Sequence, residues 1–112
     1  MTKVVLCVDD EAEVLAALRR CLRNEPYEVI TVLGAREGLA RLGQGRVDLV
    51  ITDQKMPGMS GTDFLYEVRR RSPRTARAIL TGYETLRGSA TAVKGRQGPG
   101  RRTGAQAERP QN

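Results

Sequence analysis

Four short apolar runs recur along the amino-terminal part of the chain and predict the strands of a sheet. KVVLCV occupies residues 3–8, YEVITV follows Pro26 at 27–32, VDLVIT spans 47–52 and ARAILT spans 76–81. Short runs of this kind, rich in β-branched residues and bounded by breakers, are typical of β-strands. Because consecutive positions are apolar, both faces of the sheet are expected to be covered.

The segments between these runs carry apolar residues at helical spacing. The predicted helices span residues 10–24, 35–43 and 61–72, and the last stops before Pro73. Strands that alternate with helices of this length predict βαβ units and a parallel α/β sheet. Right-handed crossovers leave few topologies, and we predict a flavodoxin-like, doubly wound sheet of order 2-1-3-4.

The composition changes after Thr81. Residues 84–94 predict only a weak helix, because Gly88 interrupts a sparse apolar stripe. Residues 95–112 contain no Val, Ile, Leu, Phe or Met, so they predict a disordered basic tail rich in glycine and arginine. The expected folded domain therefore spans residues 1–83.

Charge, hydropathy and cysteine usage narrow the class of protein. The net charge is +6, but residues 82–112 alone carry six basic and two acidic residues, so nucleic-acid binding through the domain itself is not expected. No apolar run is long enough to span a membrane, and the first residues do not resemble a signal peptide, which predicts a cytoplasmic location. We expect Cys7 and Cys21 to be reduced core residues.

Acidic residues stand directly after two of the predicted strands. Asp9 and Asp10 follow the first strand, and Asp53 follows the third. In a 2-1-3-4 sheet these strands are neighbours and form the switch point where ligands bind. Oxygen ligands of this kind suit Mg²⁺. The alternative is helix capping, since Asp9 is a good N-cap and acids suit the positive end of a helix.

The same segments resemble a known family, the receiver domain of bacterial two-component response regulators. The matching pieces are VDDE (8–11), VDLVITD ending at Asp53, MPGMSG (56–61) and ILTG (79–82). Their order, spacing and position at strand ends all match, across residues 3 to about 83. The sequence around MPGMSG most resembles that of receivers attached to transcription activators or cyclic-nucleotide phosphodiesterases.

The resemblance implies a signalling module rather than an enzyme. Asp53 is implied to be the phosphoacceptor, taking a phosphoryl group from a histidine kinase or a phosphotransfer protein. Asp9, Asp10 and Asp53 are implied to bind Mg²⁺ with the backbone carbonyl of Lys55, and Thr81 to hydrogen-bond the phosphoryl group. An output domain or partner protein is implied to read the phosphorylated state.

The chain departs from the family in its carboxyl third. The family places a lysine, usually followed by proline, at the end of a fifth strand some twenty residues beyond the threonine. Counting from Thr81 leads to residues 101–103, where no apolar strand and no Lys-Pro occur; Lys94 stands too early. An out-of-frame reading of a GC-rich gene tends to give this kind of sequence, so we infer a frameshifted or truncated reading frame. Lys55, which is close to Asp53 in the sequence, is our candidate for a cation that partly replaces the family's lysine.

Three alternative functions remain open from the sequence. The missing lysine and fifth strand favour a pseudo-receiver, a scaffold that keeps the fold but does not switch. The basic tail suggests a weaker nucleic-acid hypothesis, although no aromatic residue follows Tyr83. A phosphate-ester hydrolase with Asp53 as nucleophile is weaker again, because Lys55 stands where such enzymes have a second aspartate.

Overall fold

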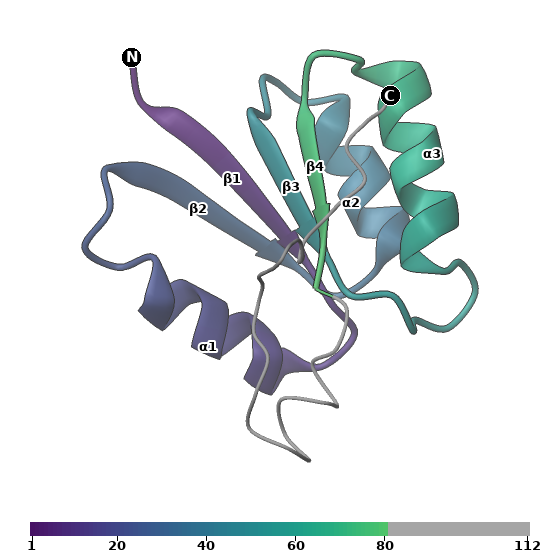
Figure 1. The fold of residues 1–112 in the computed structure, drawn as a ribbon, viewed down its shortest axis with the longest axis horizontal. Helices are drawn as coiled ribbons and strands as arrows, with labels where there is room; N and C mark the ends of the chain where they lie inside the picture. The colour runs from purple at the N-terminus through teal and green to yellow at the C-terminus, as the bar shows by residue number, and fades with distance from the viewer. Residues whose placement is uncertain (81–112) are drawn as a thin grey trace, which may run out of the picture.

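Strands and helices alternate throughout the described part of the chain. The computed structural model describes residues 1–80. The strands are β1 (Lys3–Val8), β2 (Tyr27–Val32), β3 (Leu49–Thr52) and β4 (Ala76–Ile79), and the helices are α1 (Ala12–Cys21), α2 (Ala35–Leu42) and α3 (Gly61–Arg71) (Figure 1). Thr81, the expected weak helix at 84–94 and the expected tail at 95–112 lie outside the described residues, as does the question of a fifth strand.

The four strands form one parallel sheet of order β2-β1-β3-β4, which confirms the predicted fold class. β1 pairs with β2 along its whole length, from Lys3 opposite Tyr27 to Val8 opposite Val32. β3 lies on the other side of β1, with Thr52 opposite Val8, and β4 pairs with β3. The carboxyl ends of β1 and β3 therefore adjoin at the switch point of the sheet.

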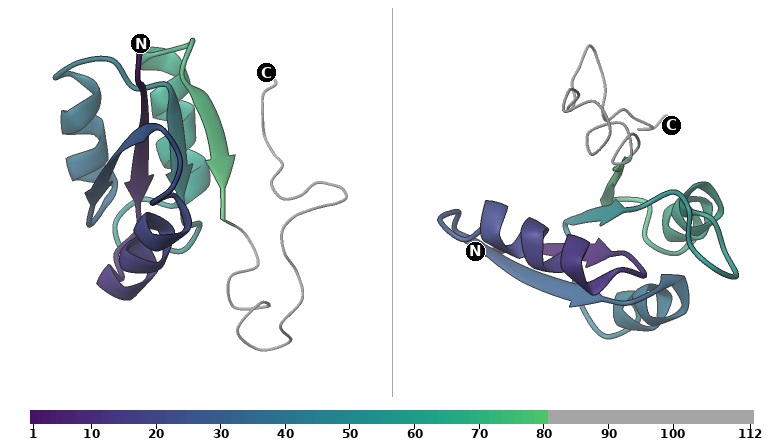
Figure 2. Two further views of the ribbon diagram at one scale, coloured as in Figure 1. Left: turned by 90° about the vertical axis from the view of Figure 1, so that its left-hand side faces the viewer. Right: turned by 90° about the horizontal axis from the view of Figure 1, so that it is seen from below.

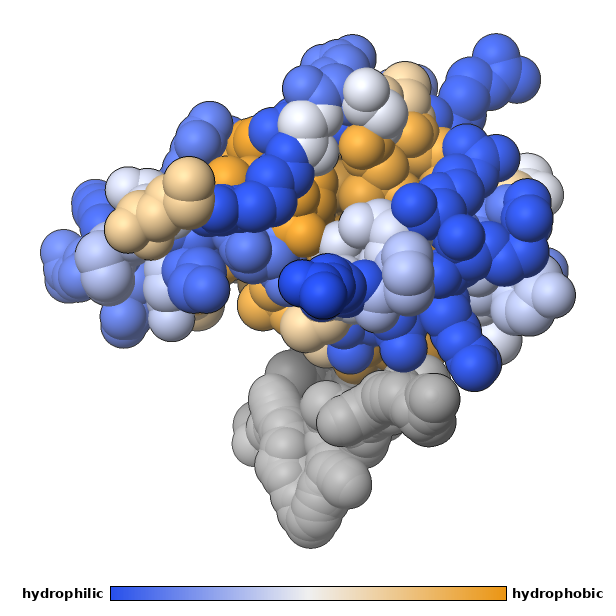
Figure 3. Space-filling view, turned by 90° about the horizontal axis from the view of Figure 1, so that it is seen from above, coloured by the Kyte–Doolittle hydropathy of each residue, from blue (hydrophilic) through white to orange (hydrophobic). Residues whose placement is uncertain are grey.

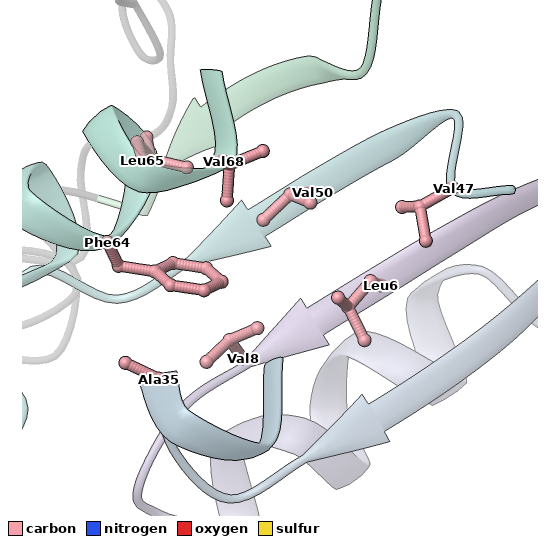
Figure 4. Packing of buried hydrophobic residues seen from close by; sticks show 8 residues of the cluster. All are labelled: Leu6, Val8, Ala35, Val47, Val50, Phe64, Leu65 and Val68. Carbon is pink, nitrogen blue, oxygen red and sulfur yellow. The ribbon is translucent and has the colours of Figure 1, made fainter. Parts of the chain in front are cut away.

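Helices cover both faces of this sheet (Figure 2). α1 packs on one face, where Val5 and Cys7 meet Leu15. α2 and α3 pack on the other face, and Phe64 projects from α3 toward the strands (Figure 4). Phe64 is fully buried, and a side chain of this size contributes roughly 1.5–3 kcal/mol by burial. The buried members of this larger cluster are Leu6, Val8, Ala35, Val47, Val50, Phe64, Leu65 and Val68.

A glycine lets α2 approach this core closely. A Cβ atom at Gly38 would stand 2.8 Å from the Phe64 ring and 3.2 Å from a methyl group of Val8. Both distances are shorter than ordinary carbon contacts. A larger residue at this position would therefore separate α2 from the sheet.

The predicted boundaries agree with the structure to within three residues, and the differences have local causes. α1 begins at Ala12 rather than at residue 10, because the Asp9 carboxylate accepts a hydrogen bond from the Glu11 N–H at 2.8 Å. β3 begins at Leu49, since the Val47 carbonyl accepts from the Thr75 hydroxyl at 2.7 Å instead of pairing with a strand.

The two cysteines occupy different environments. Cys7 is buried in β1, as predicted, whereas Cys21 is exposed, so the core position expected for Cys21 is wrong. Leu15, Leu18 and Leu22 pack against the sheet, and this places Cys21 on the outer side of α1. Both cysteines are free.

The face of the molecule seen from above is mainly hydrophilic, with one apolar region (Figure 3). Seen from above, hydrophobic side chains gather in the middle of the face and hydrophilic residues surround them (Figure 3). Among residues 1–80, no helix combines the length and the apolar character that crossing a membrane requires.

Candidate functional site

The acidic residues predicted from the sequence lie at the carboxyl edge of the sheet. Hydrogen bonds between strands continue one residue past β1 and β3 and fix both backbones. The Asp9 N–H donates to the Val32 carbonyl at 3.3 Å, and the Asp53 N–H donates to the Val8 carbonyl at 3.1 Å. These bonds hold two residues that are distant in sequence at neighbouring positions of one sheet edge.

Three carboxylates converge at this edge. One carboxylate oxygen from each of Asp9, Asp10 and Asp53 lies within 4.8 Å of the other two. Asp9 is buried, with 2% of its surface exposed, Asp53 is half-buried and Asp10 is exposed. The cluster therefore extends from a buried carboxylate to an exposed one, and its exposed side is accessible to a small ion or a phosphoryl group.

Burial and mutual repulsion raise the pKa of two of these groups. The pKa of Asp9 rises from 3.8 to about 6, mainly through burial and further through Asp53, Asp10 and Glu11, although the Glu11 N–H opposes the rise. Burial also raises the pKa of Asp53, and Asp10 and Glu11 add to it. Hydrogen bonds from the backbone N–H groups of Gln54 and Lys55 act in the opposite direction on Asp53.

The donor set fits a hard divalent cation better than it fits helix capping. Glu11, not Asp9, is the N-cap of α1, and its side chain makes no capping hydrogen bond. Asp9 makes one hydrogen bond to the Glu11 N–H, which leaves its other oxygen and the neighbouring carboxylates to repel one another. Clustered carboxylate oxygens with access to water are what Mg²⁺ uses in proteins, and such an ion removes the repulsion.

The loop after Asp53 is fixed by contacts that the sequence did not reveal. The Gln54 carbonyl accepts from the Gly61 N–H at 2.8 Å. The Gln54 side chain accepts from both the N–H and the hydroxyl of Thr62, at 2.8 and 3.0 Å. The Ser60 hydroxyl caps α3 by accepting from the Asp63 N–H at 3.1 Å. A polar residue after a strand-ending aspartate was the available signal, but its partners seven and eight residues away were not predictable.

Gly61 allows the loop to close against the phosphoacceptor candidate. A Cβ atom at Gly61 would stand 2.2 Å from the backbone carbonyl oxygen of Asp53 and 3.0 Å from the Cα of Gln54. Both neighbours are backbone atoms that cannot rotate away. The glycine is evident within MPGMSG, but its close approach to the Asp53 carbonyl leaves no signal in the sequence.

The remaining predicted site residues are placed only in part. Lys55 follows Asp53 by two residues in this loop and is exposed. Thr81 lies outside the described residues, so its role stays a prediction. The last described residue, Leu80, donates its N–H to the Thr52 carbonyl at 2.7 Å, so pairing with β3 continues to the end of the described chain.

The fold and the site together define a class: a doubly wound parallel α/β domain with an acidic cluster at its switch point. The sequence model of the response regulator receiver domain matches residues 5–96. The chain therefore belongs to the response regulator receiver family, which confirms the resemblance seen in its motifs. Receivers are signalling modules, and their family typically binds Mg²⁺ at an acidic pocket.

Transcriptional regulators are among the relatives in sequence. The chain is 46% identical over 79 residues to the hydrogenase transcriptional regulatory protein HoxA of Cupriavidus necator, covering 70% of this chain and 16% of that protein. It is 33% identical over 90 residues to the transcriptional regulatory protein GlrR of Escherichia coli, covering 80% and 20% respectively. The chain thus spans a fifth or less of the length of these two relatives.

Solved receivers share the fold. The response regulator TrrA of Thermotoga maritima, determined in complex with Mg²⁺ and BeF, matches with a TM-score of 0.69 at 35% identity, covering 79% of this chain and 76% of that one. The signal receiver domain of an HD domain-containing protein from Pseudomonas fluorescens matches with a TM-score of 0.71 at 31% identity, covering 80% and 72%.

Proposed function

We propose that this chain is a phosphoacceptor module of a two-component system, phosphorylated on Asp53 in the presence of Mg²⁺. The observation that carries the proposal is the convergence of Asp9, Asp10 and Asp53, whose oxygens lie within 4.8 Å of one another. Two of these groups have raised pKa values because they are buried beside other acids. Membership of the receiver family supports the same role.

Asp53 is suited to act as the nucleophile. In its ionised form, a carboxylate oxygen attacks the phosphorus of a phosphohistidine, the new P–O bond forms, and the P–N bond breaks as the imidazole leaves with the electron pair. The backbone N–H groups of Gln54 and Lys55 favour the ionised form of Asp53. The fixed loop holds this carboxylate in place, and positioning supplies much of the catalysis of phosphoryl transfer.

The metal site in this proposal consists of the carboxylates of Asp9, Asp10 and Asp53 with the backbone carbonyl of Lys55. When bound, Mg²⁺ neutralises the charge that builds up between carboxylate and phosphoryl oxygens. Asp9 contributes a buried anchor, and Asp10 an exposed carboxylate at the mouth of the cluster. Thr81 completes the proposed site as a hydrogen-bond donor to the phosphoryl group.

The proposed partners follow from this chemistry. The phosphoryl donor is a histidine kinase or a phosphotransfer protein, and an output domain or partner protein reads the phosphorylated state. The proposed location is cytoplasmic, and no enzymatic turnover of a separate substrate is proposed. HoxA and GlrR are transcriptional regulators by name, which supports a transcriptional output without identifying it.

Intact-mass spectrometry after incubation with acetyl phosphate tests the proposal. We expect one phosphoryl adduct on the wild-type chain with Mg²⁺, none in EDTA, and none on Asp53→Asn. Asp63→Asn serves as the matched control, because Asp63 is exposed on α3 and lies outside the acidic cluster. A folded wild-type chain that gains no adduct would favour the alternative, a pseudo-receiver, for which the missing lysine of the family argues.

Lys55 is proposed to supply part of the positive charge that the missing lysine would provide. It follows Asp53 by two residues, and its ammonium group carries a full charge on a long flexible stem. We expect Lys55→Ala to slow phosphorylation by acetyl phosphate without preventing Mg²⁺ binding. An unchanged rate would remove Lys55 from the proposal and leave the aspartate cluster unaffected.

A further inference from the structure

A groove runs between α1 and β2, away from the acidic cluster. Its volume is about 470 Å³, and it is lined by residues from the carboxyl-terminal half of α1, from the turn after α1 and from β2. Tyr27, the first residue of β2, is part of this lining. Because β1 and β2 are parallel, Tyr27 lies at the amino-terminal end of the strands, and Asp9 lies at their carboxyl-terminal end. Figure 1 shows α1 beside β2, at the outer edge of the sheet.

Three arginines line the groove, and no acidic residue among residues 1–80 does. Arg19, Arg20 and Arg23 are exposed, and all three line the groove, the first two from α1 and Arg23 from the turn that follows it. Arg19 donates a hydrogen bond to the Thr31 hydroxyl at 3.2 Å, which directs it toward β2. The ion pairs found among residues 1–80 lie elsewhere, at Arg46–Asp48, Arg70–Glu67 and Arg71–Glu67.

The floor of the groove is apolar. Leu22 and Val29 are half-buried, and the Tyr27 side chain is 40% exposed. Tyrosine and arginine, which both line this groove, are enriched at binding hot spots between proteins. Clustered guanidinium groups are the chemistry that recognises acidic motifs.

We propose that this groove binds an acidic segment of a partner protein, with carboxylates pairing with Arg19, Arg20 and Arg23 and an apolar side chain entering between Leu22, Tyr27 and Val29. The volume suits a few side chains rather than a long polymer. The charge complementarity favours an acidic occupant, and the apolar floor favours a peptide over a nucleic acid, whose backbone is charged at every phosphate. This site is separate from the phosphoacceptor and does not depend on the proposed function.

The test uses the full chain and a fluorescein-labelled peptide in which leucines alternate with glutamates, measured by fluorescence anisotropy. The groove variant is Arg19→Gln/Arg20→Gln/Arg23→Gln. The control variant is Arg36→Gln/Arg41→Gln/Arg74→Gln, which removes the same charge from surface sites outside the groove and retains the basic residues beyond Leu80. A second peptide, with glutamine in place of every glutamate, isolates the contribution of the carboxylates.

We expect the groove variant to bind the acidic peptide more than about tenfold more weakly than wild type, since hydrogen bonds between charged groups are stronger than those between neutral ones. The control variant should change affinity by less than about twofold, because exposed charges far from a ligand are screened by salt. Tyr27→Ala should weaken binding several-fold while phosphorylation by acetyl phosphate continues. Circular dichroism verifies that each variant is folded.

Three results would overturn the proposal. The first is an equal loss of affinity in the groove and control variants, which would indicate attraction to overall positive charge. The second is equal binding of the glutamate and glutamine peptides by wild type. The third is tighter, groove-dependent binding of a single-stranded oligonucleotide of the same charge, which would assign the groove to nucleic acid.

Discussion

Removing the charge of Asp9 should stabilise the metal-free protein, although Asp9 is central to the proposed metal site. Asp9 is 2% exposed and stands against Asp10 and Asp53 in the cluster. Asp9→Asn keeps the size of the side chain and the oxygen that accepts from the Glu11 N–H. The substitution therefore removes the buried negative charge with little change in shape.

The pKa of Asp9 gives the magnitude. Its rise from 3.8 to about 6 is about two pKa units, and each unit corresponds to about 1.4 kcal/mol of penalty on the charged form. The free energy of unfolding of wild type without metal is therefore reduced by about 3 kcal/mol at neutral pH. An asparagine amide is also desolvated by burial, so we expect Asp9→Asn to gain about 2 kcal/mol.

The pH dependence identifies the cause. Between the ordinary pKa of an aspartate and the raised one, the folded state binds more protons than the unfolded state, so Asp9 makes wild-type stability fall as pH rises from about 4 to about 7. Asp9→Asn lacks this contribution, and the two proteins should be about equally stable near pH 4. Urea denaturation in EDTA, followed by circular dichroism at both pH values, measures the difference.

Magnesium should reverse the order of stability. Mg²⁺ that binds the folded state raises the free energy of unfolding by mass action, and wild type should gain more than Asp9→Asn because it retains the full carboxylate set. Two results would contradict a destabilising Asp9 charge. One is that Asp9→Asn is less stable than wild type in EDTA at neutral pH, and the other is that the difference in their free energies of unfolding does not change with pH.

Two further predictions concern backbone contacts. Gly61→Ala should lower the free energy of unfolding by about 2–3 kcal/mol and slow phosphorylation of Asp53, because the new Cβ would stand 2.2 Å from the Asp53 carbonyl oxygen. The control is Gly43→Ala, where the nearest contact of a Cβ is 3.6 Å; it should leave the free energy of unfolding and the phosphorylation rate nearly unchanged. Asp48→Asn should destabilise the protein at neutral pH, because the Asp48 carboxylate accepts from the Val4 N–H at 2.7 Å and this bond lowers its pKa. That loss should disappear as pH falls through the pKa of Asp48 in the folded protein, and an undiminished loss in acid would contradict this assignment.

The sheet was predictable because its strands are short apolar runs with breakers at their ends. β1 and β2 have the predicted bounds of 3–8 and 27–32. The start of β3 was not predictable from local pattern, because Val47 is as apolar as Val50 and Ile51 within β3, but its carbonyl accepts a hydrogen bond from Thr75, 28 residues away. Tertiary partners of this kind leave no trace in periodicity.

The acidic cluster was predictable because parallel strands place their carboxyl ends at one edge. Once the order 2-1-3-4 was assumed, Asp9 and Asp53 had to adjoin, and their backbones do. What holds Asp53 in position could not be predicted in the same way. The hydrogen bonds that Gln54 accepts from the N–H groups of Gly61 and Thr62 form only when α3 closes the loop, and sequence spacing does not specify that closure.

The most direct test of Asp53 as a magnesium-dependent phosphoacceptor is to locate the modified residue after reaction with acetyl phosphate. Borohydride reduction converts an aspartyl phosphate to homoserine, and peptide mass spectrometry then identifies its position in the chain. We predict homoserine at position 53, formed only with Mg²⁺ and lost when Asp9 and Asp10 are both changed to asparagine. Modification at another carboxylate, or at Asp53 with equal yield in EDTA, would contradict the assignment of this acidic cluster as a magnesium-dependent phosphoacceptor site.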